Sequence, residues 1–267
     1  MARGNILNVY PLSSMQEGML VHSLLNDQSE AYFEQIIMDI EGTLDIVKLE
    51  QALTELIARY DILRTVFIHQ KIKKPRQVVL KERTTRIHVE DLSHIEASKK
   101  DTLLDQYIKQ DRKKGFNLSK DVLVRLTVVK MSETSFKLIW SHHHIIMDGW
   151  SIPTVLNDFF TIYQQLKGNQ PIQLDPVYPY STFIKWLGNQ NREEAQQKWQ
   201  EYIMGYQPVS LIPETKYNQK YQQAEYHFVV NKDITSGLKK VAKDAQVTLN
   251  SVFQSIWGIL LQKYTKC

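Results

Sequence analysis

Three consecutive histidines, His142, His143 and His144, are the residues of this sequence best suited to chemistry. A neutral imidazole accepts or delivers a proton near pH 7 more readily than other side chains do. An acid and a glycine, Asp148 and Gly149, follow shortly afterwards. This grouping predicts a site for proton transfer or for hydrogen bonding to a reacting group.

The residues around the histidines predict a strand, a turn and a helix. Residues 135–143 alternate as a strand does, which places His142 and His144 on one face and His143 on the other. The acid and the glycine indicate a turn, because glycine tolerates a positive φ. Apolar residues at helical spacing then predict a helix over residues 151–167.

The run from His143 to Gly149 resembles the HHxxxDG motif of condensation domains of nonribosomal peptide synthetases, within the chloramphenicol acetyltransferase-like superfamily. Other segments resemble motifs of the same family, in the same order along the chain. Residues 13–19 are similar to its first motif, residues 59–67 to its second, RHExLRTxF, and residues 180–186 to its fourth, YxDFxxW. The order and spacing of the matches make the resemblance specific.

Some positions depart from the family pattern or allow a simpler interpretation. Asp61 replaces the usual glutamate of the second motif but keeps the acid, whereas Thr182 replaces the usual acid of the fourth. The aromatic residues around Thr182 have helical spacing and are expected in the core. In the first motif, Ser13 and Gln16 predict a capping box. That segment also resembles the subtype of condensation domain whose donor ends in a D-residue.

The resemblance implies a fold and a reaction. The fold class is α/β, an α+β sandwich of the chloramphenicol acetyltransferase-like type, with a mixed central sheet flanked by helices. The reaction joins a peptidyl or aminoacyl thioester to the amine of an aminoacyl group, both held on the phosphopantetheine arms of carrier proteins. The implied partners are an upstream donor peptidyl carrier protein and a downstream acceptor carrier protein. No cofactor is expected to bind to the domain itself.

The resemblance also implies roles for single residues. His144 is the candidate for chemistry, either as a base toward the attacking amine or as a group that orients this amine and stabilises the intermediate. Asp148 is implied to pair with Arg64, which would brace the turn after the histidines. Gly149 would leave room for the pantetheine arm or offer its backbone N–H, and His143 would pack behind the site.

The resemblance covers essentially all 267 residues but only a little over half of the family domain. Residues 1–170 are expected to form the core of an N-terminal, donor-side subdomain. Residues 171–267 are expected to be a linker and the start of a C-terminal part whose remainder is absent. Such a fragment is expected to be inactive alone. The alternatives are a non-catalytic fragment that binds a donor carrier protein or its arm, and an acyl-CoA-type acyltransferase of the same superfamily.

Composition argues against several other classes of protein. The single cysteine, Cys267, allows no intrachain disulfide and favours a reducing, cytoplasmic setting. No run of about 18 apolar residues occurs, so we expect neither a membrane span nor a signal peptide. The net charge of +4 is mild, and the basic residues at 71–76 fit a solvated hairpin or loop better than a nucleic-acid site.

A metal site is the main rival, since His142 and His144 share a predicted face near Asp148. No other histidine, cysteine or acid has the spacing of a ligand set, so we expect no metal. A Ser-His-Asp hydrolase is less favoured, because the sequence has no G-x-S-x-G turn.

Periodicity also predicts the other elements of the chain. Strands are expected over residues 33–41, 78–80, 87–89, 122–130 and 225–230. Helices are expected over residues 47–60, 97–111, 193–204, 234–244 and 249–264.

Overall fold

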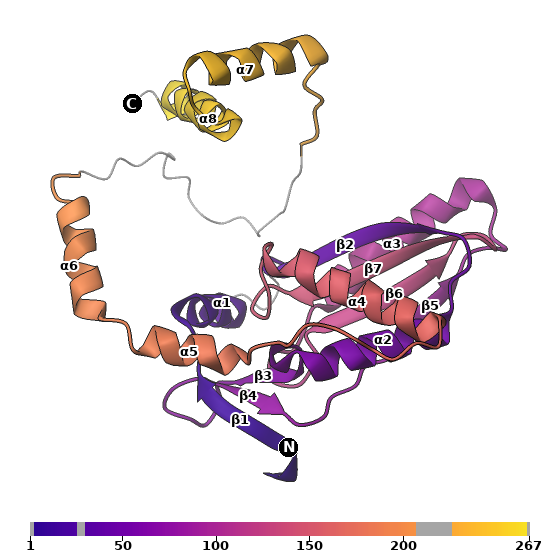
Figure 1. Cartoon of the computed structure of the whole chain (residues 1–267). Helices are drawn as coiled ribbons and strands as arrows, with labels where there is room; N and C mark the ends of the chain where they lie inside the picture. Colours follow the sequence, from indigo (N-terminus) through magenta and orange to yellow (C-terminus); the bar gives the residue numbers. More distant parts are fainter. Residues whose placement is uncertain (1–2, 26–29, 207–225, 266–267) are drawn as a thin grey trace. The chain divides into compact units, whose positions relative to one another are not determined.

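A computed structural model describes residues 3–25, 30–206 and 226–265 of the chain (Figure 1). The chain divides into two compact units, residues 1–190 and residues 191–267. The sequence predicts the end of the core at residue 170, whereas α5 (Tyr180–Gly188), beyond that point, packs on β1 (Ile6–Pro11) in the first unit. The predicted division of the whole family domain remains a prediction.

The strands of the first unit form two sheets (Figure 1). One is three-stranded and antiparallel, with the order β1, β4 (Arg76–Leu80), β3 (Thr65–Ile68). The other is mixed, with the order β2 (Phe33–Glu41), β7 (Ser135–His143), β6 (Val124–Lys130), β5 (His88–Asp91), and β5 runs parallel to β6. The basic residues at 71–74 are exposed in the loop between β3 and β4, as predicted.

Helices cover both faces of the mixed sheet. On one face, α2 (Ile46–Arg59) lies beside α4 (Ser151–Lys167) (Figure 1). On the other face, α3 (Ala97–Lys114) packs through Leu104 against Val129 and Ile139. This arrangement confirms the predicted mixed sheet flanked by helices; the three-stranded sheet was not predicted.

The main core lies between the mixed sheet and the pair α2 and α4. Leu138 and Trp140 of β7 are fully buried there with Leu53 of α2 and Phe159 of α4. The rings of Trp140 and Phe159 meet edge to face at a centroid distance of 5.7 Å. Full burial of such a side chain contributes about 1.5–3 kcal/mol. The middle of β7 is therefore firmly anchored, and its C-terminal end carries the histidines.

The second unit contains α6 (Arg192–Tyr202), α7 (Lys232–Asp244) and α8 (Leu249–Thr265). α7 packs on α8, and the chain between them turns at Gln246 with φ 55°. The three helices were predicted with similar bounds. Residues 226–230 are not in a strand, so the strand predicted there is wrong, and residue 225 lies outside the described residues. Among the described residues, no helix has the length and apolar character that crossing a bilayer requires.

Candidate active site

The three histidines lie at the C-terminal end of β7 and in the turn that follows. β7 ends at His143, so His144 is the first turn residue and strand alternation no longer sets its direction. The His144 N–H donates to the Tyr32 carbonyl at 2.8 Å, and the His143 N–H donates to the Leu123 carbonyl at 3.0 Å. These bonds hold the histidine backbone from both neighbouring segments.

The His143 side chain is a brace of the turn. Its Nδ1 accepts the Ile145 N–H at 3.1 Å, so the proton of the neutral ring lies on Nε2. Nε2 lies 3.5 Å from the Ser23 hydroxyl, which itself donates to the Met19 carbonyl at 2.9 Å. Burial, followed by the two neighbouring histidines, lowers the pKa of His143 to about 4. The ring is therefore neutral at pH 7 and serves as a structural contact.

His142 is enclosed on the face of β7 that Trp140 also occupies. Its exposed fraction is 0%, and neither of its ring nitrogens has a hydrogen-bond partner. Burial, followed by the charge of His144, lowers the pKa of His142 to about 4. An imidazole without hydrogen bonds is costly in a core. His142 cannot meet a substrate and is excluded from direct chemistry.

His144 is the histidine that a ligand can reach. Its side chain is partly exposed, whereas its Nδ1 is buried without a hydrogen-bond partner. Nε2 is thus the nitrogen available to a reacting group. In the part of the chain that the structure describes, no side chain bonds Nδ1 and fixes the tautomer. Nε2 can therefore serve as a hydrogen-bond donor or as an acceptor of a proton.

The Asp148 carboxylate caps the helix that follows the histidines. Its Oδ1 accepts the backbone N–H of Trp150 at 3.2 Å and both the N–H and the hydroxyl of Ser151, at 2.9 and 2.7 Å. These bonds, those from Ser151 first, lower the pKa of Asp148. An acid at a helix start satisfies free N–H groups, so Asp148 fixes how the turn enters α4.

Arg64 lies at the end of a one-turn 3-10 helix, η2 (Asp61–Arg64). Its Nη2 donates to Asp61 Oδ1 at 2.5 Å, and its Nη1 donates to the carbonyls of Leu80 and Lys81 at 2.8 and 3.2 Å. Arg64 and Asp148 thus both have partners other than the one that the resemblance implied, and the predicted brace between them is not formed. Asp61 is the nearer acid, since one turn of helix brings it beside Arg64.

Gly149 is exposed next to Asp148. Its φ lies outside the positive region, and a Cβ atom built on it would meet no heavy atom within 4 Å. The expectation that the turn uses the conformational freedom of glycine is therefore wrong. The space beside Gly149 is open, and its use by a substrate arm remains a prediction.

Helix α1 (Ser14–Leu25) also holds the histidine turn. The predicted capping box is formed: Ser13 Oγ accepts the Gln16 N–H at 3.2 Å, and Gln16 Oε1 accepts the Ser13 N–H at 3.0 Å. Gln16 Nε2 then donates to the Ile145 carbonyl at 3.2 Å. Oε1 also accepts from Gln77 of β4 at 3.0 Å. Sequence patterns missed this link, because only the fold brings Gln16 to Ile145.

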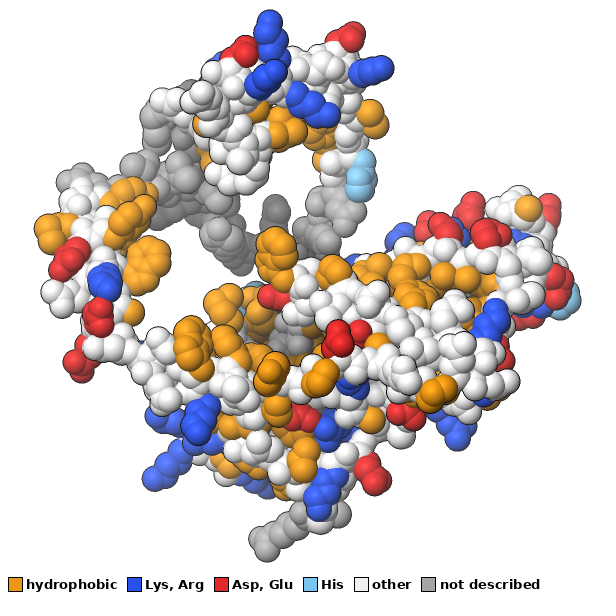
Figure 2. All heavy atoms as spheres, viewed as in Figure 1, with side chains coloured by type: hydrophobic (Ala, Val, Ile, Leu, Met, Phe, Trp, Pro, Cys, Tyr) orange, Lys and Arg blue, Asp and Glu red, His pale blue; other side chains and the backbone are white. Residues whose placement is uncertain are grey.

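The aromatic residues of α5 are less buried than the sequence predicts. Tyr180 is half-buried. Burial, and with it the charge of Asp148, raises the pKa of Tyr180, while a hydrogen bond with Ser13 opposes this rise. Phe183 and Trp186 are 45% and 57% exposed, so the prediction of a core position is wrong for both. Figure 2 shows exposed hydrophobic side chains over α5 and α1. These side chains make the surface over α5 and α1 apolar.

We also searched for a metal-binding cluster and for hollows. Within residues 3–25, 30–206 and 226–265, no three histidine, cysteine or acidic side chains are placed to share a metal ion. An open hollow of about 460 Å³ lies between α2, α4 and the segment after α4, away from the histidines. Its lining residues are Glu55, Ala58, Arg59, Ile162, Ile172, Leu174 and Val177.

Comparison with known families identifies the chain. The family model described as the condensation domain matches residues 6–267. The chain belongs to the condensation domain family. Among curated relatives, one component of the linear gramicidin synthase of Brevibacillus parabrevis is 52% identical over 263 residues, which are 98% of this chain and 5% of that protein. One component of the plipastatin synthase of Bacillus subtilis (strain 168) is 44% identical over 98% of this chain and 10% of that protein.

Solved condensation domains share the fold. The first condensation domain of the calcium-dependent antibiotic synthetase, in complex with a substrate analogue, aligns with TM-score 0.78 at 16% identity, covering 98% of this chain and 61% of that one. A four-domain nonribosomal peptide synthetase bound to AMP and glycine aligns with TM-score 0.80 at 24% identity, covering 98% of this chain and 20% of that one. The predicted chloramphenicol acetyltransferase-like α/β fold is confirmed.

Proposed function

We propose that this chain carries the histidine-bearing part of a site that forms peptide bonds in nonribosomal peptide synthesis. Membership of the condensation domain family supports this, as do relatives whose names denote synthases of gramicidin and plipastatin. One structural observation carries the proposal: the HHxxxDG segment is held by β7, α1 and α4, and presents a single reachable imidazole, that of His144.

The proposed reaction is attack of an amine on a thioester carbonyl. The amine nitrogen forms a bond to the carbonyl carbon, and the tetrahedral intermediate loses a proton from nitrogen as the carbon–sulfur bond breaks. Nε2 of His144 accepts that proton and returns it to the departing thiolate. The products are an amide and a free thiol, so no other reactant is needed.

The supporting residues act through the conformation of the turn. His143 holds the Ile145 N–H, and Asp148 sets the start of α4. Arg64 acts at a greater distance, by fixing the carbonyls at the end of β4. Gly149 keeps space open for the substrate arm. We assign these roles as proposals, and only His144 is proposed to touch the reacting atoms.

Phosphopantetheine enters this proposal as part of the substrates. An upstream donor carrier protein and a downstream acceptor carrier protein would present the two thioesters on their arms. The domain itself would hold no cofactor. The sequence form around Gln16 supports a donor that ends in a D-residue, which competition between peptidyl thioesters of D and L configuration would test.

We also propose that the chain alone offers only one wall of the site. The chain spans 61% of one solved condensation domain. Exposed apolar side chains also gather over α1 and α5, among them Met15, Phe183 and Trp186. A contiguous exposed apolar patch marks a surface that another part covers. We therefore expect the chain alone to bind a donor arm without turnover, and the chain with the rest of a condensation domain to make product.

Mass spectrometry of carrier-bound products tests both points. Product from the chain alone would contradict its incompleteness, and no product from either preparation, with both folded, would contradict the proposed function. In the active preparation, His144→Ala is expected to lower kcat by about 10²–10⁴-fold, as loss of a general base does. His142→Leu is the control, because His142 has no access to substrate. A loss under about tenfold for His144→Ala would exclude the base role.

A further inference from the structure

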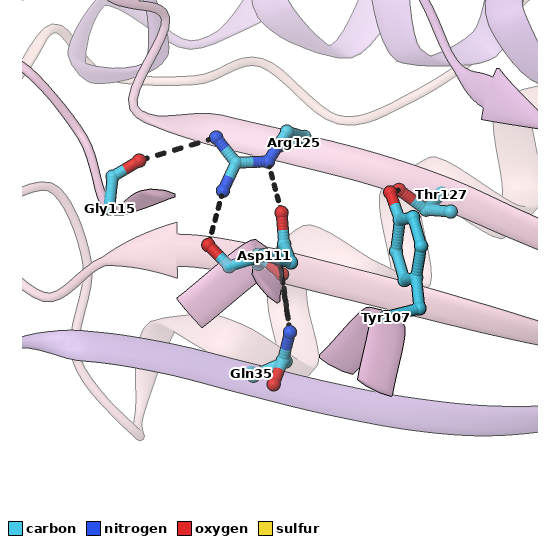
Figure 3. Close-up of polar contacts among 7 residues, drawn as sticks. Gln35, Tyr107, Asp111, Gly115, Arg125 and Thr127 are labelled. Atoms are coloured by element: carbon cyan, nitrogen blue, oxygen red, sulfur yellow. Dashed lines mark hydrogen bonds and ion pairs between the residues drawn. The ribbon is translucent and has the colours of Figure 1, made fainter. Parts of the chain in front are cut away.

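A buried ion pair joins Asp111 of α3 to Arg125 of the mixed sheet (Figure 3). Asp111 of α3 accepts from Arg125 Nε at 2.6 Å, from the Ser141 hydroxyl at 2.6 Å and from Gln35 Nε2 at 3.0 Å. Arg125 also donates to the Asp111 and Gly115 carbonyls at 3.1 and 3.3 Å. The Asp111 side chain is only 4% exposed. Its carboxylate is satisfied within the protein, and the proposed reaction does not use it.

The three residues that reach Asp111 form one row across the mixed sheet. Gln35 of β2 and Arg125 of β6 are both register partners of Ser141 on β7. His143 follows Ser141 on the same strand face. One carboxylate from α3 therefore ties together three strands directly before the histidine turn.

A buried ion pair is weak evidence for a role in stability. The cost of burying an ion pair offsets much of its attraction, and apolar residues of similar shape often serve as well. In some proteins a buried polar pair instead selects one geometry among several. Here the geometry at stake is the register of β7.

The contacts of Asp111 distinguish the observed register of β7 from a two-residue slip, which the alternation of apolar residues does not exclude. A slip of β7 by one residue would turn Leu138 and Trp140 out of the core, so the apolar pattern already opposes it. A slip by two residues keeps that alternation but brings Ile139 or His143 to the row of Asp111. The carboxylate would then lose the Ser141 hydroxyl. The polar row opposes such a slip, together with the short turn between β6 and β7.

We propose that Asp111 is a positioning residue of the condensation site, which fixes the register of β7 and thereby the place of His143 and His144. The kinetic test of this proposal rests on the proposed function, whereas the NMR test of the histidine rings does not. Ser141 transmits the effect, because it contacts Asp111 and precedes the histidines in one continuous strand.

The test needs two variants and a matched control. Ser141→Ala removes one hydroxyl from β7, and Asp111→Asn keeps the shape but removes the charge. The control, Asp158→Asn, disrupts a second largely buried pair, in which Asp158 accepts from Arg59 at 2.8 Å and from the Tyr60 hydroxyl at 2.7 Å. That pair joins α4 to α2 and has no bond to β7.

Nitrogen–proton NMR of the histidine rings, in the full chain, gives the structural readout. We expect one Nε2–H form of His143 in the wild type and in Asp158→Asn. We expect a mixture of tautomers, or a shifted ring resonance, in Ser141→Ala and Asp111→Asn. An unchanged His143 ring in a folded Ser141→Ala variant would overturn the proposal, even if Asp111→Asn fails to fold.

Condensation kinetics with the complete domain give the second readout. At a temperature where all variants are folded, Ser141→Ala and Asp111→Asn are expected to lower kcat by about 10- to 100-fold, because small misplacements of catalytic groups are costly, with KM within about twofold. Asp158→Asn should leave both constants unchanged. Equal kcat losses in all three would refute a positioning role. If the wild type makes no product, the proposed function fails, whereas the NMR comparison still decides the role of Asp111.

Discussion

Lowering the pH from 7 to 5 is expected to destabilise the first unit through two buried histidines. Burial lowers the pKa of both His142 and His143 from 6.5 to about 4. Below pH 6.5 the unfolded chain therefore binds protons that the folded chain does not, and stability falls until the pH reaches about 4. At pH 5 the free energy of unfolding is lower than at pH 7 by about 2 kcal/mol for each histidine, at about 1.4 kcal/mol per pH unit.

His142→Leu isolates one of these two contributions. The leucine fills a site among Trp140 and other apolar side chains, and it replaces a ring whose nitrogens have no partner. We expect the variant to be at least as stable as the wild type at pH 7. Between pH 7 and 5 it should lose about 2 kcal/mol less, because one titrating group is gone.

Urea unfolding followed by tryptophan fluorescence measures the free energy of unfolding of the wild type and of His142→Leu at each pH. Other titrating groups are common to all variants and cancel in the comparison. If His142→Leu loses stability as steeply as the wild type, the depressed pKa of His142 is refuted.

Two further predictions concern the contacts that hold the turn. Asp148→Ala should lower the free energy of unfolding by about 1 kcal/mol through loss of the α4 cap. In the double variant this effect should add to that of Arg64→Ala. A coupling above about 0.5 kcal/mol in urea unfolding would show that the two residues interact. Gln16→Ala should cost about 1–3 kcal/mol by leaving the Ile145 carbonyl unpaired, with faster hydrogen exchange in the histidine turn, whereas the exposed Gln197→Ala in α6 should change neither.

The sequence by itself determined the elements that local periodicity specifies. β2, β7 and α4 have the predicted bounds, 33–41, 135–143 and 151–167, because two-residue and 3.6-residue repeats are properties of the local chain. The capping box of Ser13 and Gln16 is equally local. The order of the motifs identified the family and, with it, the fold.

Partners distant in sequence were decided only by the tertiary structure. β1 was missed, and the strand that it pairs with, β4, lies far along the chain. The acid beside Arg64 is Asp61, because one turn of η2 brings the two side chains together, whereas the resemblance implied Asp148. Gln16 reaches Ile145 only after α1 docks beside the histidine turn. The role of Asp111 needs α3 to lie over three aligned strands, because a hydrogen bond depends on distances that only packing sets.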